Sequence, residues 1–144
     1  MRLFTIGFTK KDACSFFTSL NTAKVRRVID VRLNNVSQLA GFSKREDLCY
    51  FLKAICGIDY LHLLDLAPTQ EMLDQYKKVS RDWKAYEASF RSLIKARNIE
   101  DKLDKQLFDG SCLLCSEHEP EHCHRRIVAE YLRDHWESVE IVHL

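Results

Sequence analysis

Short apolar runs alternate with amphipathic helical segments along the chain, and this alternation predicts the fold. The runs expected to form strands cover residues 3–6, 28–31, 58–63, 111–115 and 139–142. Between them, apolar side chains recur at the three- and four-residue spacing of helices. Strands that alternate with helices are typical of βαβ units and a parallel sheet. We therefore expect an α/β fold, a three-layer α/β/α sandwich with a mostly parallel sheet of about five strands.

Local signals indicate where the helices begin and end. The first helix is expected to begin at a Thr9 cap, and the second at the capping box of residues 43–46. Gly57 should end the second helix, since glycine accepts the left-handed backbone of a helix end. Further helices are expected from Pro68, over residues 82–97, through residues 103–107, and from a point between Pro120 and Cys123. We interpret the aromatic stripe of the 82–97 helix as core, because burial requires that spacing.

Length and charge restrict the class of protein. A chain of 144 residues fits one domain covering residues 1–144, and its net charge of +1 gives no global field for nucleic acid. The first residues do not resemble a signal peptide, and no apolar run approaches the roughly 20 residues of a membrane span. We therefore expect a cytoplasmic protein with no membrane partner and with its six cysteines reduced. Nothing in the sequence indicates an oligomeric state.

Polar and reactive side chains gather where the predicted strands end. In an open parallel sheet these ends share one edge, and ligands bind beyond it. The residues expected at this edge are Gly7, Thr9, Asp30, Arg32, Asn34, Tyr60, Cys115, Glu117, Cys123, His124 and Arg125. Their convergence predicts a functional site there, with Gly7, Thr9, Asn34, Tyr60, His124 and Arg125 as candidate ligand-binding residues.

Two cysteines are the candidate nucleophiles of this edge. Cys115 ends a strand, and Cys123 lies near the start of a helix, where the helix dipole lowers the pKa of a thiol. Either thiol can instead be a packed core residue. His124 and Arg125 at the same helix start form a candidate anion site. Glu117 is a candidate general base, and it can equally orient Arg125 or cap the helix.

Asp30 and Arg32 form a second candidate pair. They stand two residues apart on one strand, so their side chains share a face of the sheet. The pair can act as an acid and a base in catalysis, or it can be a salt bridge that anchors the sheet edge. The sequence leaves both interpretations open.

A metal site must also be considered, because Cys112, Cys115, His118, His122, Cys123 and His124 lie within thirteen residues. Zinc prefers such ligands in a tetrahedral arrangement. However, Cys112 and Cys115 should point to opposite faces of a strand, roughly 10 Å apart. We therefore assign no metal ligands and no cofactor, and we keep a structural zinc site as an alternative.

The residues at this edge carry a resemblance to a known family. Thr5-Ile6-Gly7-Phe8-Thr9, Asp30-Val31-Arg32, Gly57-Ile58-Asp59-Tyr60, and the stretch from Leu114-Cys115-Ser116-Glu117 to Cys123-His124-Arg125 resemble the family grouped as domain of unknown function 488. The resemblance extends nearly end to end and supports the fold and the place of the site. Many members carry Pro-x-Ser-Arg where this chain has residues 35–38 without an arginine, which weakens a phosphate-binding role for that loop.

A looser likeness connects the chain to rhodanese-type domains, which also place a cysteine at a strand end before an arginine-bearing helix. Their loop is a compact glycine-containing cradle. Here Arg125 comes ten residues after Cys115, and none of the residues between them is glycine. We therefore do not assign sulfur transfer.

Three functions remain as hypotheses. The first is a thiol- or acid–base-assisted enzyme, with Cys115, Glu117, Cys123, Asp30 and Arg32 as its catalytic residues, acting on a small anionic or nucleotide-like substrate. The second is a non-catalytic module that binds an anion or nucleic acid. A local cluster of basic residues gives weak support for nucleic-acid binding, and a solvated surface explains the cluster more simply. The third is the structural zinc domain.

Overall fold

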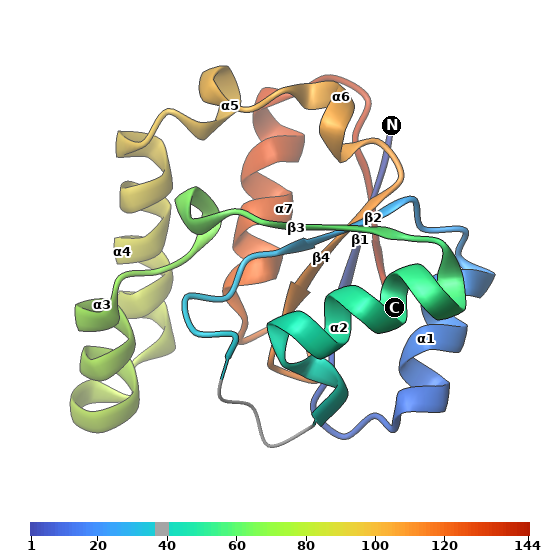
Figure 1. Cartoon of the computed structure of the whole chain (residues 1–144). Coiled ribbons are helices and arrows are strands. Elements are labelled where there is room, and N and C mark those ends of the chain that lie inside the picture. The colour runs from blue at the N-terminus through green and yellow to red at the C-terminus, as the bar shows by residue number, and fades with distance from the viewer. Residues whose placement is uncertain (37–40) are drawn as a thin grey trace.

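A five-stranded sheet forms the centre of the protein (Figure 1). The computed structural model describes residues 1–36 and 41–144. The strands are β1 (Arg2–Gly7), β2 (Arg27–Asp30), β3 (Asp59–His62), β4 (Ser111–Cys115) and β5 (Glu140–His143). They follow the order β3-β2-β4-β1-β5, and each neighbouring pair is parallel. Every strand bound lies within one residue of the prediction.

Helices cover both faces of the sheet, which confirms the predicted three-layer sandwich. The helices α1 (Ala13–Thr22) and α2 (Arg45–Phe51) pack on one face. On the other face lie α3 (Gln70–Asp74), α4 (Trp83–Ala96) and α7 (His124–His135), while the short helices α5 (Ile99–Lys102) and α6 (Lys105–Phe108) lead into β4. None of the helices in the described ranges is long and apolar enough to cross a membrane.

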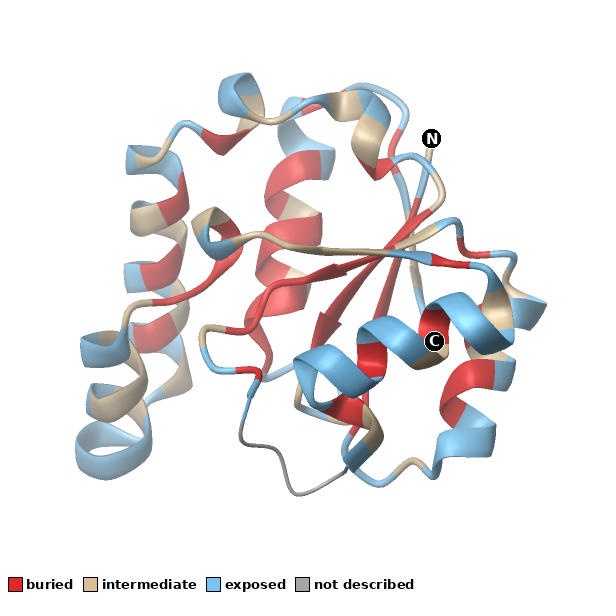
Figure 2. Cartoon of the chain, in the orientation of Figure 1, coloured by how far each residue is buried: buried red, intermediate tan, exposed pale blue. Residues whose placement is uncertain are grey.

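The three inner strands are the most buried part of the chain (Figure 2). Every residue of β4 is buried, as are all residues of β1 except Arg2. Strands covered on both faces read as continuous apolar runs, which is why the hydrophobic pattern predicted them. The edge strands β3 and β5 are only partly buried.

Two helix starts and one short helix differ from the predictions. The helix expected through residues 103–107 is instead two helices, α5 and α6, with Leu103 and Asp104 between them. Asp12, not Thr9, caps α1, because its carboxylate accepts a hydrogen bond of 2.7 Å from the Ser15 amide. A 3₁₀ turn over Gly41–Ser43 precedes α2, so Lys44 takes the N-cap position that the capping box assigned to Ser43. The end of this helical segment is as predicted. A π-helical turn, Leu52–Cys56, follows α2, and Gly57 ends it with a φ of 63°.

The order of the strands places β4 at a switch in the direction of the chain. From β1 to β3 the chain moves outward through α1 and α2, and from β3 to β5 it returns through the helices of the other face. Opposite directions on opposite faces are what a single crossover handedness requires. Strand β4 lies between β1 and β2. The connection after β4 leads to α7 on one face, whereas the connections after β1 and β2 lead to α1 and α2 on the opposite face. Ligands bind at such switch points in open α/β sheets.

Candidate functional site

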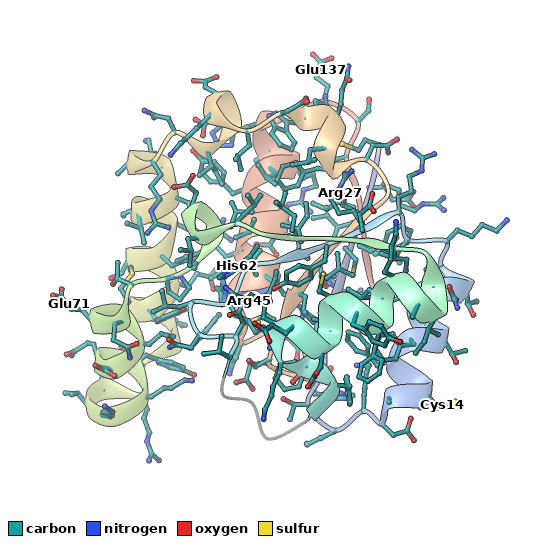
Figure 3. The ribbon with its side chains drawn as sticks, in the orientation of Figure 1. Cys14, Arg27, Arg45, His62, Glu71 and Glu137 are labelled. Atoms are coloured by element: carbon teal, nitrogen blue, oxygen red, sulfur yellow. The ribbon has the colours of Figure 1, made fainter. Side chains whose placement is uncertain are left out.

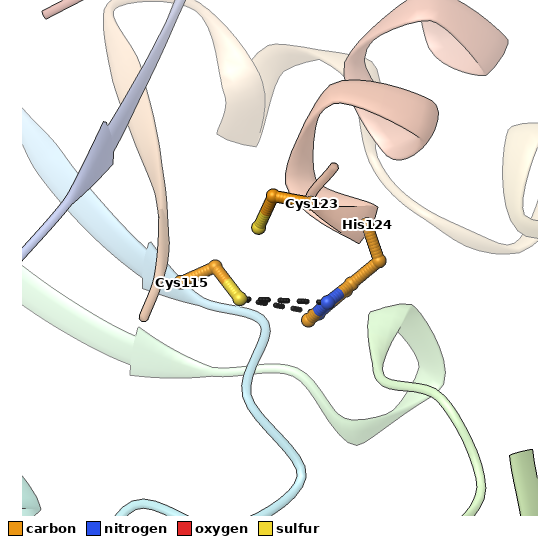
Figure 4. A group of neighbouring side chains, drawn as sticks. All are labelled: Cys115, Cys123 and His124. Carbon is orange, nitrogen blue, oxygen red and sulfur yellow. Dashed lines mark hydrogen bonds between the residues drawn. The ribbon is translucent and has the colours of Figure 1, made fainter. Parts of the chain in front are cut away.

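The carboxyl end of β4 and the start of α7 bring three reactive side chains together (Figure 4). Cys115 is the last residue of β4, Cys123 takes the N-cap position of α7, and His124 begins that helix. Their sulfur and nitrogen atoms all lie within 4.8 Å of one another. All three side chains are buried, so their interactions are stronger than on a solvated surface.

Hydrogen bonds fix the ring of His124 in one orientation. Its Nε2 lies 2.7 Å from the carbonyl oxygen of Val31, which can only accept, so Nε2 carries a proton. Its Nδ1 therefore faces the sulfur of Cys115, at 3.4 Å. The ring of Phe90 packs edge-on against the imidazole. The end of β2 thus orients a side chain of α7 toward the end of β4.

The two thiols differ in their ionisation. Burial alone would raise the pKa of Cys123, but hydrogen bonds with Cys115 and His124 and the positive charge of Arg125 hold it well below the ordinary thiol value. Burial, together with the neighbouring Cys123 sulfur, raises the pKa of Cys115 well above that value. The N-terminal dipole of α7 favours a negative charge at the same place. The pair therefore loses its first proton from Cys123.

A cavity of about 200 Å³ opens over these three side chains. Its wall of aromatic rings comes from Tyr76, Trp83 and Tyr86, and His122 stacks on Trp83 with ring centroids 5.1 Å apart. The sequence did not predict this wall, because a stripe of aromatic residues at helical spacing predicts core. That prediction is confirmed for Tyr86, Phe90 and Ile94, which are buried, whereas Trp83 is only partly buried. The position of Trp83 as the first residue of α4 is the signal that could have indicated that this ring is not fully buried.

The loop between β4 and α7 is held by its own neighbours. The amide and the hydroxyl of Thr9 both donate to the carbonyl of Ser116, at 3.1 and 2.6 Å. Arg125 donates from Nη1 to the carbonyl of Glu117 at 2.6 Å and from Nη2 to that of His118 at 3.0 Å. Arg125 is 1% exposed and lies outside the cavity lining. Its observed contacts are with the loop backbone, and not with the cavity in which an anion would bind.

Gly7 lies directly under this loop. A Cβ at this position would fall 1.6 Å from the carbonyl oxygen of Glu117 and 3.2 Å from Nη1 of Arg125. No other residue fits without moving the loop, because real Cβ contacts stay beyond 3.0 Å. Gly7 therefore permits the close approach of two backbones rather than contacting the cavity.

Asp30 and Arg32 form a buried ion pair at the end of β2, in contact with Tyr60 and Phe8 of the opposite layer. The carboxylate of Asp30 accepts from Arg32 Nε and Nη2 at 2.9 and 2.7 Å, from Asn35 at 3.2 Å and from the Tyr60 hydroxyl at 2.7 Å. The guanidinium of Arg32 lies over the ring of Phe8, 5.2 Å from its centroid. Of the two interpretations that the sequence left open, this geometry matches the salt bridge that anchors the sheet edge.

The predicted site residues therefore separate into two groups. Arg32, Asn34, Cys115, Glu117, Cys123 and His124 line the cavity, whereas Gly7, Thr9, Asp30, Tyr60 and Arg125 support it from outside. Glu117 is exposed and is one of the residues that line the cavity. Residues Ser37 and Gln38, which replace the charged loop of many family members, lie outside the described residues.

An ion-pair network joins the aromatic wall to the thiol helix. Glu87 of α4 accepts from Arg126 at 2.8 Å, from Arg91 at 3.0 Å and from the indole N–H of Trp83 at 3.1 Å. Arg126 also donates to the carbonyl of Glu121 at 3.0 Å. The network thereby fixes Trp83, the loop and the first turn of α7 relative to one another.

The same three side chains can hold a soft metal ion. Two thiolates and an imidazole are donors that zinc prefers, and the proton on Nε2 leaves Nδ1 of His124 free to bind. Cys112 is excluded from this set, since it packs on the opposite face as predicted. His118 contacts the Thr9 carbonyl and His122 stacks on Trp83. A fourth ligand would have to come from the cavity.

Comparison with known proteins agrees with the resemblance seen in the sequence. The model of the family described as "Domain of unknown function DUF488" matches residues 12–132. No curated protein and no solved structure matches the chain significantly. The matched range contains β2, β3 and β4, the Asp30 ion pair, both thiols and His124. The chain therefore belongs to the DUF488 family.

Proposed function

We propose that the protein is a thiol-dependent enzyme in which Cys123 attacks a small substrate that carries a flat ring and an anionic group. The observation that supports this proposal best is the setting of Cys123: a buried thiol at the N-cap of α7, beside Cys115 and His124, at the base of a cavity. A thiol held as the thiolate in such a place is an activated nucleophile.

The size and lining of the cavity support the substrate class. A cavity of about 150 Å³ holds one benzene ring, and sites for drug-sized ligands reach roughly 300–1,000 Å³. The volume of about 200 Å³ therefore suits one heteroaromatic ring, with the rest of the substrate outside. Tyr76, Trp83 and Tyr86 offer stacking surfaces. Lys77 and Asn34 on the lining, together with the N-terminus of α7, offer positive charge and donors to an anion.

Each group has a distinct role in the proposed reaction. The sulfur of Cys123 supplies both electrons of the new bond to the electrophilic atom of the substrate. The bond from that atom to the leaving group breaks, and the leaving group departs with its electron pair. His124 and the dipole of α7 stabilise the thiolate before attack. Glu117 in the cavity lining is placed to exchange a proton with the leaving group or with an entering water.

The proposal is tested by the rate at which iodoacetamide alkylates each cysteine at pH 6, followed by peptide mapping. An ordinary thiol with a pKa of about 8.5 is only about 0.3% thiolate at this pH. Each unit by which the pKa falls raises the thiolate fraction tenfold and lowers nucleophilicity about threefold. We expect Cys123 to react at least about tenfold faster than the exposed Cys14 and Cys49, which serve as internal references (Figure 3 shows Cys14 on α1).

The controls separate this proposal from its alternatives. Cys112→Ser, on the opposite face, should leave the rate at Cys123 unchanged. A rate at Cys123 no faster than at Cys14 or Cys49 would overturn the proposal. Elemental analysis of the purified protein is measured in parallel. One tightly bound zinc per chain would favour the second candidate function, a zinc site at Cys115, Cys123 and His124.

The substrate class is tested by thermal shift with adenosine monophosphate, ribose 5-phosphate and inorganic phosphate. A ligand at a hundred times its Kd stabilises the folded state by about 2.7 kcal/mol. We expect the nucleotide to stabilise the protein more than either ring-free anion, and Trp83→Ala to remove that difference. Tyr50→Ala removes an exposed ring outside the cavity lining and should keep it. Equal shifts with all three anions would argue against a ring-binding cavity.

A further inference from the structure

Cys115 and Cys123 form a pair of thiols that the proposed attack by Cys123 does not fully use. Their sulfur atoms lie within 4.8 Å of each other, and both residues line the same cavity. They come from different elements, Cys115 from the inner strand β4 and Cys123 from the start of α7 (Figure 4). The structure thus places a second thiol where it can react with any sulfur-bound group on the first.

We infer that Cys123 and Cys115 carry out a dithiol–disulfide cycle with a peroxide as the oxidant, Cys123 reacting first and Cys115 resolving the product. This inference uses the same reactive Cys123 thiol as the proposed function and gives it a further activity. The cavity admits a small peroxide to the buried pair, whereas a macromolecular oxidant would not fit within about 200 Å³.

The steps balance in atoms and electrons. The Cys123 thiolate attacks one oxygen of the peroxide, the O–O bond breaks, and Cys123 becomes a sulfenic acid while hydroxide or alkoxide leaves and is protonated. The sulfur has then been oxidised by two electrons and the peroxide reduced by two. Cys115 attacks the sulfenic sulfur, the S–O bond breaks, and water leaves with the Cys115 proton. Two molecules of glutathione, or one of dithiothreitol, return the disulfide to two thiols by exchange and are themselves oxidised to a disulfide.

The order of reaction follows from the positions of the two sulfurs. Cys123 sits at the N-terminus of α7, whose dipole favours the thiolate, and Cys115 sits at the end of a strand. Closing the pair to an S–S bond of about 2.05 Å needs a small movement.

The chain contains its own reference thiols for the test. Cys112 is fully buried on the opposite face of β4, and Cys14 and Cys49 are exposed on the surface. None of the three lies in the cavity lining. A reaction driven by exposure alone would oxidise Cys14 and Cys49 first, and a reaction driven by the cavity would oxidise Cys123 first.

The experiment treats the full chain with one equivalent of hydrogen peroxide, blocks free thiols with N-ethylmaleimide, and maps peptides without reduction. We expect the protein to lose two of its six free thiols, a cross-linked peptide joining Cys115 to Cys123, and full recovery with dithiothreitol. Cys115→Ser should stop at a Cys123 sulfenic acid that dimedone traps. Cys123→Ser should form no cross-link, and Cys112→Ser should behave as the wild type.

Two results would overturn the inference. One is oxidation of Cys14 or Cys49, giving cross-linked dimers, while Cys115 and Cys123 stay reduced. The other is direct oxidation of Cys123 to sulfinic acid with no cross-link in the wild type. If Cys123 is still alkylated rapidly at pH 6 in the same preparation, the failure belongs to the dithiol cycle alone. Slow alkylation would instead remove the proposed function.

Discussion

Gly7 lies under the loop that joins β4 to α7, and Gly7→Ala tests how tightly that loop is held. The new Cβ would sit 1.6 Å from the carbonyl oxygen of Glu117, while real Cβ contacts stay beyond 3.0 Å. The Glu117 carbonyl must therefore move by about 1.4 Å. A movement of this size disrupts the hydrogen bond of 2.6 Å that this carbonyl accepts from Arg125.

The expected cost has three contributions. Overpacking of a tight site costs about 1–3 kcal/mol, and loss of a buried hydrogen bond from a charged donor costs about 1.5–3 kcal/mol. Replacing glycine restricts the unfolded chain, which raises the free energy of unfolding by about 0.4–1 kcal/mol. The free energy of unfolding should therefore fall by about 3 kcal/mol. For a domain of this length such a loss lowers Tm by about 10 °C.

The assay is thermal unfolding followed by circular dichroism, with the alkylation rate of Cys123 measured well below Tm. Gly41→Ala is the matched control, because a Cβ there meets nothing within 4 Å. We expect the control to change Tm little and Gly7→Ala to slow alkylation of Cys123, since Arg125 helps to hold the pKa of that thiol low. Equal Tm values for the two variants would refute the close packing described for Gly7.

Two other changes test the supports of the site. Burial opposes ionisation of Asp30, yet hydrogen bonds and charge from Arg32 hold its pKa below the ordinary value. The ionised carboxylate therefore stabilises the folded state above about pH 4, and this stabilisation is lost as the pH falls through the lowered pKa. In urea unfolding at pH 7, Asp30→Asn should lower the free energy of unfolding by about 3–5 kcal/mol. It should also flatten the pH dependence of that free energy below pH 4, and an unchanged pH dependence would contradict this reasoning. Glu87→Gln should cost about 1–2 kcal/mol and increase acrylamide quenching of Trp83, whose indole it holds. Glu137→Gln, at an exposed site, should do neither.

The hydrophobic pattern predicted the sheet well because of how a parallel sheet is buried. The inner strands β1, β2 and β4 are covered on both faces, so each appears in the sequence as a short, mostly apolar run. Helix starts were less predictable. Thr9 and Asp12 are both good capping residues three positions apart, and the Ser116 carbonyl at the end of β4 engages the Thr9 hydroxyl. This contact between segments far apart in the sequence determines which residue caps the helix, and local propensity cannot predict it.

The candidate site was predictable in position and only partly in composition. Strand ends share an edge, so Cys115 was correctly placed near Cys123 and His124. The interactions of each charged side chain depended on contacts that the sequence does not encode locally. Arg125 at a helix start suggests an anion site, but the loop folds back and offers its carbonyls instead. Trp83 belongs to the same stripe as the core residues, and only the tertiary structure shows that it faces a cavity.

The two buried clusters act together through the backbone at the end of β2. The carboxylate of Asp30 accepts from the amide and the guanidinium of Arg32, which fixes the peptide units on both sides of Val31. The carbonyl of Val31 holds the Nε2 proton of His124, and this bond aims Nδ1 at the sulfur of Cys115. Asp30 therefore fits the role of a positioning residue for the thiol pair, although it faces the opposite layer. Asp30→Asn should therefore change the pH profile of Cys123 alkylation as well as stability, an effect that a purely structural salt bridge would not produce.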